Sequence, residues 1–568
     1  MTTLTKLMTG AAALAVLAAP AAAERGSAGQ VNIIYWQAPS ILNPFLSGGT
    51  KDVESSSLVI EPLARYDETG AMVPWLVDEI PTLANGGVSE DLTSITWTLS
   101  EGILWSDGTP MTAEDVVFTA EYCMDPTGGC QQLASFNDVE SVEAVDAQTV
   151  KITFSKPKPF PYGPFVGAQS PIIQKAQFAE CMGIKAPECT DENFAPVGTG
   201  PFTVTDFKPN DVVTFAANPN YRDPAKPAFA TVLFKGGGDA ASAARSVLET
   251  GEFDYAWNLQ VEPEILSQMA AAGRGEVISA FGTSVERIHT NFTNPDPSLG
   301  DKRSTLEGGA HPFLADPAVT KALSLAIDRE ILVIAGYGAA GQVTCNVLPN
   351  PAIYNSTAND WCKTQDIDAA NALLDEAGYT MGGDGVRVSP NGDRLSVLFQ
   401  TSTNSVRQGT QALLKQMWAE IGVETELRNL DASVFFGGDP ASPDTFQKFY
   451  ADLEMFTNSF DGTDPETYMA SWKSDDIPSP ANGWLGNNIP RFQSEEYDAL
   501  VKEMSETAEL EKRAELAKRM NDMVIQSGAI IPLIHRGGVS AHANSLTGVV
   551  MNEWDSELWN IADWGRAQ

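Results

Sequence analysis

The sequence predicts an α/β protein of two or three lobes, and three observations lead to this prediction. The chain has 568 residues, of which about 545 remain after removal of a 23-residue leader, so several hydrophobic cores fit within it. Its 43% hydrophobic and 19% charged residues are typical of a folded globular protein and argue against disorder. From about residue 313 onward, segments of helical periodicity alternate with segments of strand character, as in α/β lobes.

Residues 1–23 predict a cleaved signal peptide. Lys6 supplies the positive charge, residues 7–19 form a short apolar core, and Ala21–Ala23 fit the small-residue rule for cleavage before Glu24. The apolar run is too short to span a bilayer, and no Cys lies near the cleavage point to carry a lipid. We therefore expect a soluble periplasmic protein, the alternative being a leader that stays attached as an anchor.

The chain carries 74 acidic against 36 basic residues, a net charge of −38. Nucleic acid is not expected as a partner, because neutralising phosphates requires Lys and Arg. A strongly acidic surface suits cationic ligands, a saline habitat or simple solubility, and the sequence leaves these explanations open.

The six cysteines form three near pairs in the sequence: Cys123 with Cys130, Cys181 with Cys189, and Cys345 with Cys362. An even number in an exported chain predicts disulfides, and local pairing closes the shortest loops. No pair has the C-x-x-C spacing of a redox or zinc site. We expect three structural bridges, each stabilising the fold by roughly 2–4 kcal/mol.

The N-terminal half begins with residues 31–36 (VNIIYW), whose β-branched and aromatic side chains predict a buried strand. A helix is expected from about residue 50, where Asp52 and Glu54 complement the positive end of the helix dipole. Residues 94–99 alternate in polarity and predict a half-buried strand.

The stretch 105–122 (WSDGTPMTAEDVVFTAEY) predicts a turn followed by a helix. Thr112 is a suitable N-cap, and Asp115 completes a capping-box pattern with Asp in place of the usual Glu. The acidic pair Glu114 and Asp115 is explained more simply by the helix dipole than by catalysis.

A glycine-rich turn follows the strand expected at 231–235. Gly236, Gly238 and Ala241 match G-x-G-x-x-A, and Asp254 follows at about the right distance for a dinucleotide site. Such a site is not expected, because no second βαβ half is nearby and the chain is exported.

The C-terminal half supplies the alternating elements. Helices are expected after residue 313, at 366–379 and at 406–421, with Gly378 and Gly422 at the ends of the last two. Strands are expected at 395–400, 423–430 and 453–459, and short strands in the tail after residue 527.

Motifs for catalysis are absent, since the sequence contains no H-E-x-x-H, G-x-S-x-G or G-x-x-x-x-G-K-[ST]. The four His residues are scattered, and glycines separate His535 from His542, so an imidazole cage for zinc or nickel is not expected. We expect no catalytic residue, no metal site and no cofactor.

Five segments occur in a familiar order: WSDGTPMTAEDVVFTAEY, PVGTGPFTVTDF, GEFD at 251–254, LADPAVTKALSLAIDRE and ALLDEAGY. Together they resemble the peptide/nickel-type solute-binding proteins of ABC transporters (cluster C, family 5), and most closely the oligopeptide- and dipeptide-binding members. The resemblance spans nearly the whole mature chain. It implies a receptor rather than an enzyme.

The resemblance also implies a periplasmic binding protein type II-like fold, a two-lobed clamp with an extra domain. Lobe one would comprise residues 24–68, 196–288 and 528–568, the extra domain 69–195, and lobe two 289–527. The chain would cross between the lobes near 283–292 and 525–532, where hinges are expected. The solute would lie between the lobes, and the closed form, a monomer, would dock on a membrane permease.

The loop at 458–468 (NSFDGTDPETY) carries three carboxylates. It does not fit an EF-type calcium loop, because Pro465 and Glu466 occupy the fifth and sixth positions counted from Asp461. Catalysis by a carboxylate pair has no other support in the sequence. By the resemblance, Asp461, four residues before Pro465, would bind the α-ammonium group of a peptide, the alternative being a purely structural acid. Asp464 and Glu466 are expected to cap the helix that starts near 465.

The strand expected at 453–459 would, by the same resemblance, pair with the backbone of an extended peptide, which makes recognition broad. Further candidate ligand contacts, for each of which a place in the core is an equal alternative, are Asn458, Phe460, Phe456, Trp257, Tyr255, Trp36 and Phe45. Arg407 and Arg428 are candidates for binding a peptide carboxylate, but their spacing does not place them in the cleft.

We therefore predict a periplasmic receptor for peptides. Within the same fold, the alternatives are an oligosaccharide, a cationic amine or opine, or chelated nickel. A secreted hydrolase or a chaperone-like binder is the alternative from a different class, and the absence of a nucleophile–base pair argues against the hydrolase.

Overall fold

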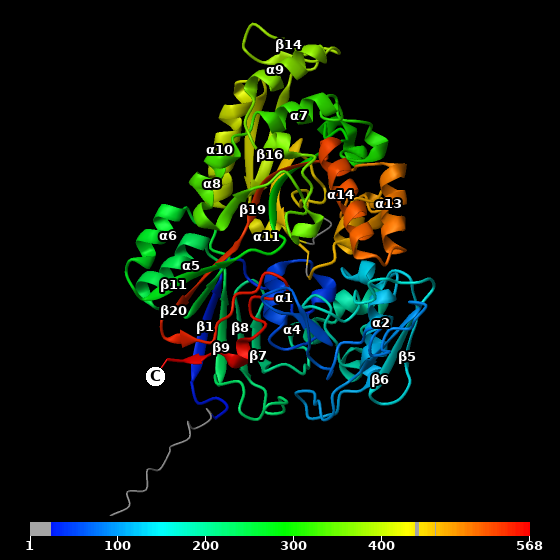
Figure 1. The fold of residues 1–568 in the computed structure, drawn as a ribbon. Coiled ribbons are helices and arrows are strands. Elements are labelled where there is room, and N and C mark those ends of the chain that lie inside the picture. The colour runs from blue at the N-terminus through cyan, green and yellow to red at the C-terminus, as the bar shows by residue number, and fades with distance from the viewer. Residues whose placement is uncertain (1–23, 438–441, 461, 568) are drawn as a thin grey trace, which may run out of the picture.

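The computed structural model describes residues 24–437, 442–460 and 462–567, and Figure 1 shows their arrangement. The predicted signal peptide at 1–23 and the predicted ligand residue Asp461 lie outside the described residues. No helix in the described ranges combines the length and the apolar character that a membrane crossing requires. Two large mixed sheets with flanking helices confirm the predicted α/β class.

The first large sheet has seven strands. Its central strand β1 is parallel to β9 and β10, and β20 is antiparallel to β10 and β11. Val31, Ile33 and Tyr35 of β1 are fully buried, which confirms the buried strand predicted there. In spatial order the strands are β11 (Gly275–Ala280), β20 (Gly538–Ala543), β10 (Tyr255–Trp257), β1 (Gln30–Tyr35), β9 (Thr231–Gly236), β8 (Val212–Ala217) and β7 (Phe202–Lys208).

The second large sheet has six strands. β12 is antiparallel to β18 and β19, and β16 is parallel to β17 and β18. The strands predicted at 395–400, 423–430 and 453–459 are confirmed as β16, β17 and β18. In spatial order the sheet consists of β13 (Gly341–Val343), β19 (Ile530–Arg536), β12 (Val285–Thr290), β18 (Leu453–Asn458), β16 (Ser396–Ser402) and β17 (Glu424–Leu430).

Helices pack on the second sheet in two groups (Figure 1). One core joins Leu323, Leu374 and Trp418 from three helices to Phe399 of β16. A second apolar core joins three other helices, all from the C-terminal part of the chain. The first group is α7 (Pro317–Leu325), α8 (Arg329–Gly336), α9 (Ile367–Glu376) and α10 (Ser405–Ala419), and the second is α12 (Glu466–Ala470), α13 (Glu495–Ser505) and α14 (Leu510–Gln526).

A smaller antiparallel sheet and helix α2 lie beside the first large sheet. The capping box predicted for α2 is confirmed, since Thr112 donates its backbone N–H to Asp115 at 2.9 Å. These elements are β4 (Ser94–Thr98), β6 (Thr149–Phe154), β5 (Val139–Ala144) and α2 (Ala113–Met124). The remaining elements are α1 (Thr50–Ser56), α3 (Lys175–Phe178), α4 (Thr190–Phe194), α5 (Ala240–Arg245), α6 (Pro263–Ala270), α11 (Ala432–Phe435), and the short pairs β2 (Ala64–Tyr66) with β3 (Met72–Pro74), β14 (Thr380–Met381) with β15 (Arg387–Val388), and β21 (Leu546–Thr547) with β22 (Gly565–Arg566).

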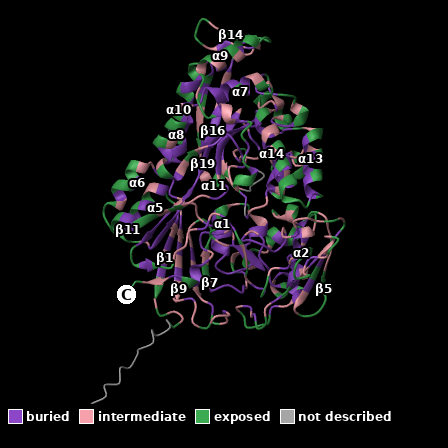
Figure 2. Cartoon of the chain, viewed as in Figure 1, coloured by how far each residue is buried: buried purple, intermediate pink, exposed green. Residues whose placement is uncertain are grey.

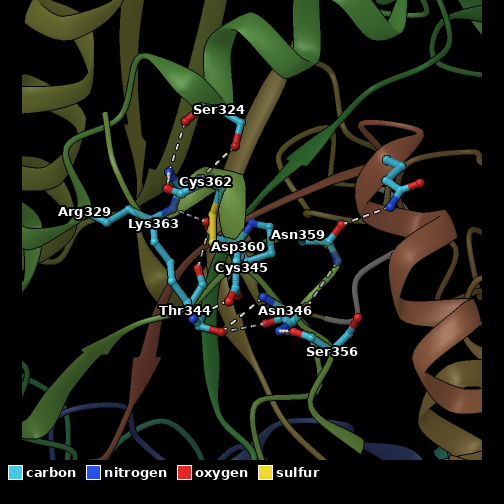
Figure 3. The surroundings of a disulfide bond; sticks show 12 residues. Ser324, Arg329, Thr344, Cys345, Asn346, Ser356, Asn359, Asp360, Cys362 and Lys363 are labelled. Carbon is cyan, nitrogen blue, oxygen red and sulfur yellow. Dashed lines mark hydrogen bonds and ion pairs between the residues drawn. A yellow bond between two sulfur atoms is a disulfide. The ribbon is translucent and has the colours of Figure 1, made fainter. Parts of the chain in front are cut away.

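All three predicted disulfides are present, Cys123–Cys130, Cys181–Cys189 and Cys345–Cys362. Figure 3 shows the third, beside the buried side chain of Arg329. Arg329 donates hydrogen bonds to the carbonyls of Cys362 and Pro532 at 2.8 and 2.9 Å, and burial lowers its pKa to about 9. The arginine thereby ties the disulfide loop to β19.

The chain passes between the two large sheets twice. β11 ends at Ala280 in the first sheet, and β12 begins at Val285 in the second. β19 ends at Arg536 in the second sheet, and β20 begins at Gly538 in the first, as the continuous C-terminal ribbon in Figure 1 shows. Figure 2 shows both sheets mostly buried around these crossings. The second crossing lies at residue 537 rather than within the expected 525–532, because β19 continues in the second sheet to Arg536. The domain ranges expected from the sequence stay a proposal.

Candidate functional site

The two large sheets meet at Arg536. Its guanidinium donates hydrogen bonds to Oδ1 of Asn258, which follows β10 of the first sheet, and to Oγ1 of Thr457 on β18 of the second, the latter at 3.3 Å. The residue is 7% exposed. Among the described residues, no carboxylate oxygen lies within 4.0 Å of its nitrogens. A buried cation without an ion pair therefore contacts both sheets.

The neighbouring carboxylate of Glu286 is already occupied. Arg407 donates to it from Nε at 2.8 Å and from Nη2 at 3.2 Å, and Thr457 donates from Oγ1 at 2.5 Å. Burial by itself would raise the pKa of Glu286, but the paired Arg407 outweighs this effect and the pKa lies below its ordinary value. Arg407, a sequence candidate for binding a carboxylate, is thus held by the protein itself.

A second contact between the two sides lies next to Arg536. Gln260 accepts a hydrogen bond from Asn404 at 3.1 Å, and Glu262 accepts one from Ser405 at 3.4 Å, both at the start of α10. Ala432 of α11 packs against the apolar cluster of the first side. The segment after β10 therefore lies against the helices of the second sheet.

The acidic loop also bridges the two sides. Gly462 donates its backbone N–H to the carbonyl of Trp554 at 2.9 Å, and a Cβ at Gly462 would lie 2.2 Å from Cζ of Tyr66. Lys158 forms an ion pair with Glu466 at 2.7 Å. The loop that contains the predicted ligand residue therefore touches the opposite side directly.

Asp464 has the structural role that the sequence predicts. It accepts the backbone N–H of Glu466 at 3.0 Å where α12 begins. It also pairs with Arg513, which binds Glu466 as well. Asp464 and Glu466 are therefore occupied by protein groups.

Three of the predicted contact residues come together on the first sheet. Trp257 stacks on Tyr35 with ring centroids 4.6 Å apart, and Trp36 lies 6.5 Å from Trp257. Tyr255 donates its hydroxyl to Glu557 at 2.5 Å. All are buried against protein.

The other predicted contacts lie in separate places. Phe456 stacks on His289 at 4.2 Å, Phe460 packs near Tyr468 at 5.0 Å, and Phe45 is fully buried against other side chains. Asn458, at the end of β18, is exposed. Of these four residues, Asn458 is the one with a surface free for a solute.

Sequence reasoning missed Arg536 and its partners Asn258 and Thr457. No motif joins them, because they come from three distant segments that meet only in the folded chain. The one signal in the sequence is a lone arginine at the end of the apolar strand IIPLIHR. The other candidate, Arg428, donates to Gln400 and to the carbonyl of Tyr450, 3.2 Å away.

Buried carboxyls gather beneath the aromatic group. Ser556 donates its hydroxyl to Glu54 at 2.7 Å, and Ser540 donates to Glu557 at 2.6 Å. Burial, reinforced by Glu557, raises the pKa of Glu54 to about 8, and burial raises that of Glu557 to about 6. The folded protein therefore keeps protons on these groups at pH values where the unfolded chain loses them.

Replacing Glu54 by glutamine is expected to flatten the pH dependence of stability. Between about pH 4.5, the ordinary pKa, and pH 8, the folded state binds more protons than the unfolded state, so the wild type loses stability as the pH rises. The glutamine side chain cannot ionise. As the pH rises through this window, the free energy of unfolding of the variant therefore increases relative to that of the wild type, by at most about 1.4 kcal/mol for each unit of pKa difference.

Urea unfolding at pH 5 and pH 8 measures this gain, with the exposed Glu114→Gln as control. A difference between E54Q and wild type that is equal at both pH values would contradict the assignment.

Comparison with known families identifies a match over residues 71–479, to the model of "Bacterial extracellular solute-binding proteins, family 5 Middle". Among characterised relatives, the glutathione-binding protein GsiB of Escherichia coli K12 is 24% identical over 464 residues, covering 81% of both chains. GsiB of Shigella boydii is 25% identical over 463 residues, again covering 81% of each.

Solved structures share the fold along nearly the whole chain. NikZ from Campylobacter jejuni, in complex with Ni(L-His), has a TM-score of 0.78 at 22% identity and covers 94% of this chain and 99% of its own. The oligopeptide-binding protein AppA from Bacillus subtilis, in complex with a nonapeptide, has a TM-score of 0.79 at 19% identity and covers 96% and 100%. The dipeptide-binding protein of Pseudoalteromonas sp. SM9913, in complex with Met-Leu, has a TM-score of 0.77 at 16% identity and covers 95% and 100%.

Proposed function

Because the chain belongs to family 5 of the bacterial extracellular solute-binding proteins, which confirms the resemblance and the two-lobed fold predicted from the sequence, we propose that it is an exported receptor for peptides. In this proposal the protein captures a peptide between its two lobes and delivers it to the permease of an ABC importer. It acts without catalysis, as a monomer, in the periplasm. The extra domain is assigned to residues 69–195, and the lobe boundaries expected near 288 and 528 move to the crossings at 281–284 and 537, because β12 and β19 belong to the second sheet.

The observation that carries the proposal is the junction between the two large sheets. Arg536, Gly462 and the start of α10 all contact the opposite side there, and the chain crosses between the sheets twice. A site between two bodies joined by such crossings closes around a solute by hinge motion. Peptides are the favoured solute because AppA and the Pseudoalteromonas protein were solved with peptides, and GsiB is named for the tripeptide glutathione.

We assign the peptide's α-ammonium group to Asp461 and its first backbone contacts to the end of β18 near Asn458. Asp464 and Glu466 are held by Arg513 and Lys158, so the other two carboxylates of the loop already have protein partners. A charge pair of this kind at about 4 Å contributes roughly 4 kcal/mol at an effective dielectric constant near 20, before desolvation is subtracted. The aromatic residues proposed with it are Phe460, Phe456, Trp257, Tyr255, Trp36 and Phe45, all packed against protein in this arrangement.

A thermal-shift screen tests the proposal. Mature protein, freed of co-purified solute by unfolding and refolding with its disulfides intact, is mixed with di- to octapeptides, their N-acetylated copies, oligosaccharides, polyamines and nickel. A peptide at about 100 times its dissociation constant is expected to stabilise the protein by roughly 2.7 kcal/mol, and acetylation is expected to abolish the effect. Asp461→Asn is expected to bind free-amine peptides more weakly than wild type does.

Other outcomes separate the alternatives. A response to sugars or nickel alone would retain the receptor and reject peptides. Equal responses to free and acetylated peptides would reject the role of Asp461. Chromatography shows whether a bound peptide is hydrolysed. If it is, the proposal that the protein acts without catalysis is rejected.

A further inference from the structure

The carboxylate of Glu553 lies at the same crossing as Arg536. A Cβ built on Gly538 would lie 1.7 Å from Oε1 of Glu553, and a Cβ on Gly282 would lie 2.4 Å from its carbonyl oxygen. Both glycines sit where the chain passes between the sheets. Any larger residue at either position would displace Glu553, so the two glycines make room for this side chain at the junction.

Glu553 has no partner of its own. Within the described parts of the chain, its carboxylate accepts no hydrogen bond and forms no ion pair, and the residue is only partly buried. Arg536, in contrast, is almost fully buried and is anchored by Asn258 and Thr457. The acid and the cation therefore act on each other electrostatically, while no ion pair within 4.0 Å joins them.

The two groups lie on one side of the crossing chain. Arg536 and Gly538 are two residues apart, and the backbone of Gly537 between them stays out of the left-handed region. Residues two apart in an extended chain point to the same side. The charges of Arg536 and Glu553 accordingly shift each other's pKa, which agrees with a place on the same side of the crossing chain.

No described carboxylate forms an ion pair with Arg536, and no described cation lies within 4.0 Å of the carboxylate of Glu553, although the charge of Glu286 acts on Arg536 from farther away. Glu286 is bound by Arg407, while Glu54 and Glu557 are held by serine and tyrosine hydroxyls. Burial and the neighbouring Glu557 and Glu54 raise the pKa of Glu553, and the charge of Arg536 opposes that rise. A positive group brought to Glu553 would favour its ionised form and oppose this rise in its pKa.

We propose that Arg536 and Glu553 form a subsite for a zwitterionic group of the solute, in which a solute carboxylate binds Arg536 and an adjacent solute ammonium binds Glu553. The inference rests on the proposed function, because it places this subsite within the site between the lobes. Two sources provide such a group. One is a free α-amino-acid head, as in a γ-linked peptide, whose α-ammonium would then bind Glu553 in place of Asp461. The other is a C-terminal residue with a basic side chain, which leaves the α-ammonium at Asp461. In either case the substrate class narrows to solutes with paired opposite charges.

Two probes distinguish the sources by calorimetry, γ-glutamyl-glycine and Ala-Ala-Lys. Each is compared with a copy in which the relevant carboxylate is an amide, and with a copy lacking the relevant amine. Wild type is expected to bind at least one of the parent probes at least about 30-fold more tightly than either copy, since truncating one partner of a buried charge pair typically costs that much or more. The probe that responds identifies the source.

The variants Arg536→Gln and Glu553→Gln assign each charge. R536Q is expected to bind the parent probe and its amide equally, and E553Q to bind the parent and the amine-free copy equally. A loss of fold would weaken the parent and its copy alike, so the ratio isolates the contact from structural damage. Arg394→Gln and Glu424→Gln, which alter an exposed ion pair of the second sheet, serve as controls and are expected to keep the wild-type ratios.

The outcomes separate this inference from the proposed function. If other peptides bind wild type while neither probe prefers its parent form, the subsite is rejected and the receptor stands. If no peptide binds at all, both are rejected. If R536Q retains the wild-type preference for the carboxylate, the assignment of Arg536 is rejected even where the probes bind.

Discussion

Replacing Gly462 by alanine is expected to weaken solute binding by about tenfold or more. The added Cβ would lie 2.2 Å from the ring of Tyr66, so the acidic loop could not keep its contact with the opposite side. A closed state destabilised by about 1.4 kcal/mol has an apparent affinity about ten times lower, because binding must first restore that state. Calorimetry with the best peptide of the thermal-shift screen measures the change.

A matched control exists in the same half of the chain. Gly483 has a φ of 65°, nearly equal to the 68° of Gly462, but no atom lies within 4 Å of the position of its Cβ. Gly483→Ala therefore introduces the same backbone strain without the contact and is expected to bind like wild type. Equal losses in both variants would show that strain, rather than the contact between the two sides, controls affinity.

Asp555→Ala is expected to lower the free energy of unfolding by about 3–5 kcal/mol. Asp555 accepts hydrogen bonds from Arg65 at 2.8 Å, from the backbone N–H of Tyr66 at 3.0 Å and from that of Ala168 at 3.1 Å. The side chains of the ion pair are 1% and 0% exposed, so the variant leaves a buried guanidinium unpaired. Urea unfolding measures the loss.

Two further variants separate charge from packing. Arg65→Met combined with Asp555→Leu removes both charges and is expected to recover part of the loss, since an apolar pair needs no counter-ion. Asp206→Ala removes the partner of exposed Lys208 and is expected to cost less than about 1 kcal/mol. A D555A variant as stable as D206A would show that the buried pair contributes little.

Much of the fold could be predicted from local patterns in the sequence. The capping box at Thr112, the helix ends at Gly378 and Gly422, and the disulfide Cys345–Cys362 each depend on residues close in sequence, and each is confirmed. Such features follow from backbone conformation and short loops, which a sequence expresses directly.

The site could be predicted much less well, because its residues come together only in the folded chain. Arg536, Asn258 and Thr457 are separated by 79 to 278 positions, and nothing in the sequence states that they touch. The sequence did offer Arg407 as a carboxylate ligand, but it could not reveal that Glu286 on another strand already binds it. Which charged side chains pair with each other depends on how the sheets assemble. The sequence therefore identifies candidate charged residues but does not show which of them remain unpaired.

The strand order also has a consequence for how this chain is made. β20 lies between β10 and β11 of the first sheet, and β19 lies between β12 and β13 of the second, yet both strands come from the last 39 residues of the chain. A nascent chain therefore cannot complete either sheet until synthesis is almost finished, and its long-range pairing makes folding slow. We propose that this chain is exported, and a topology of this kind keeps it from completing either sheet before its C-terminus has been made.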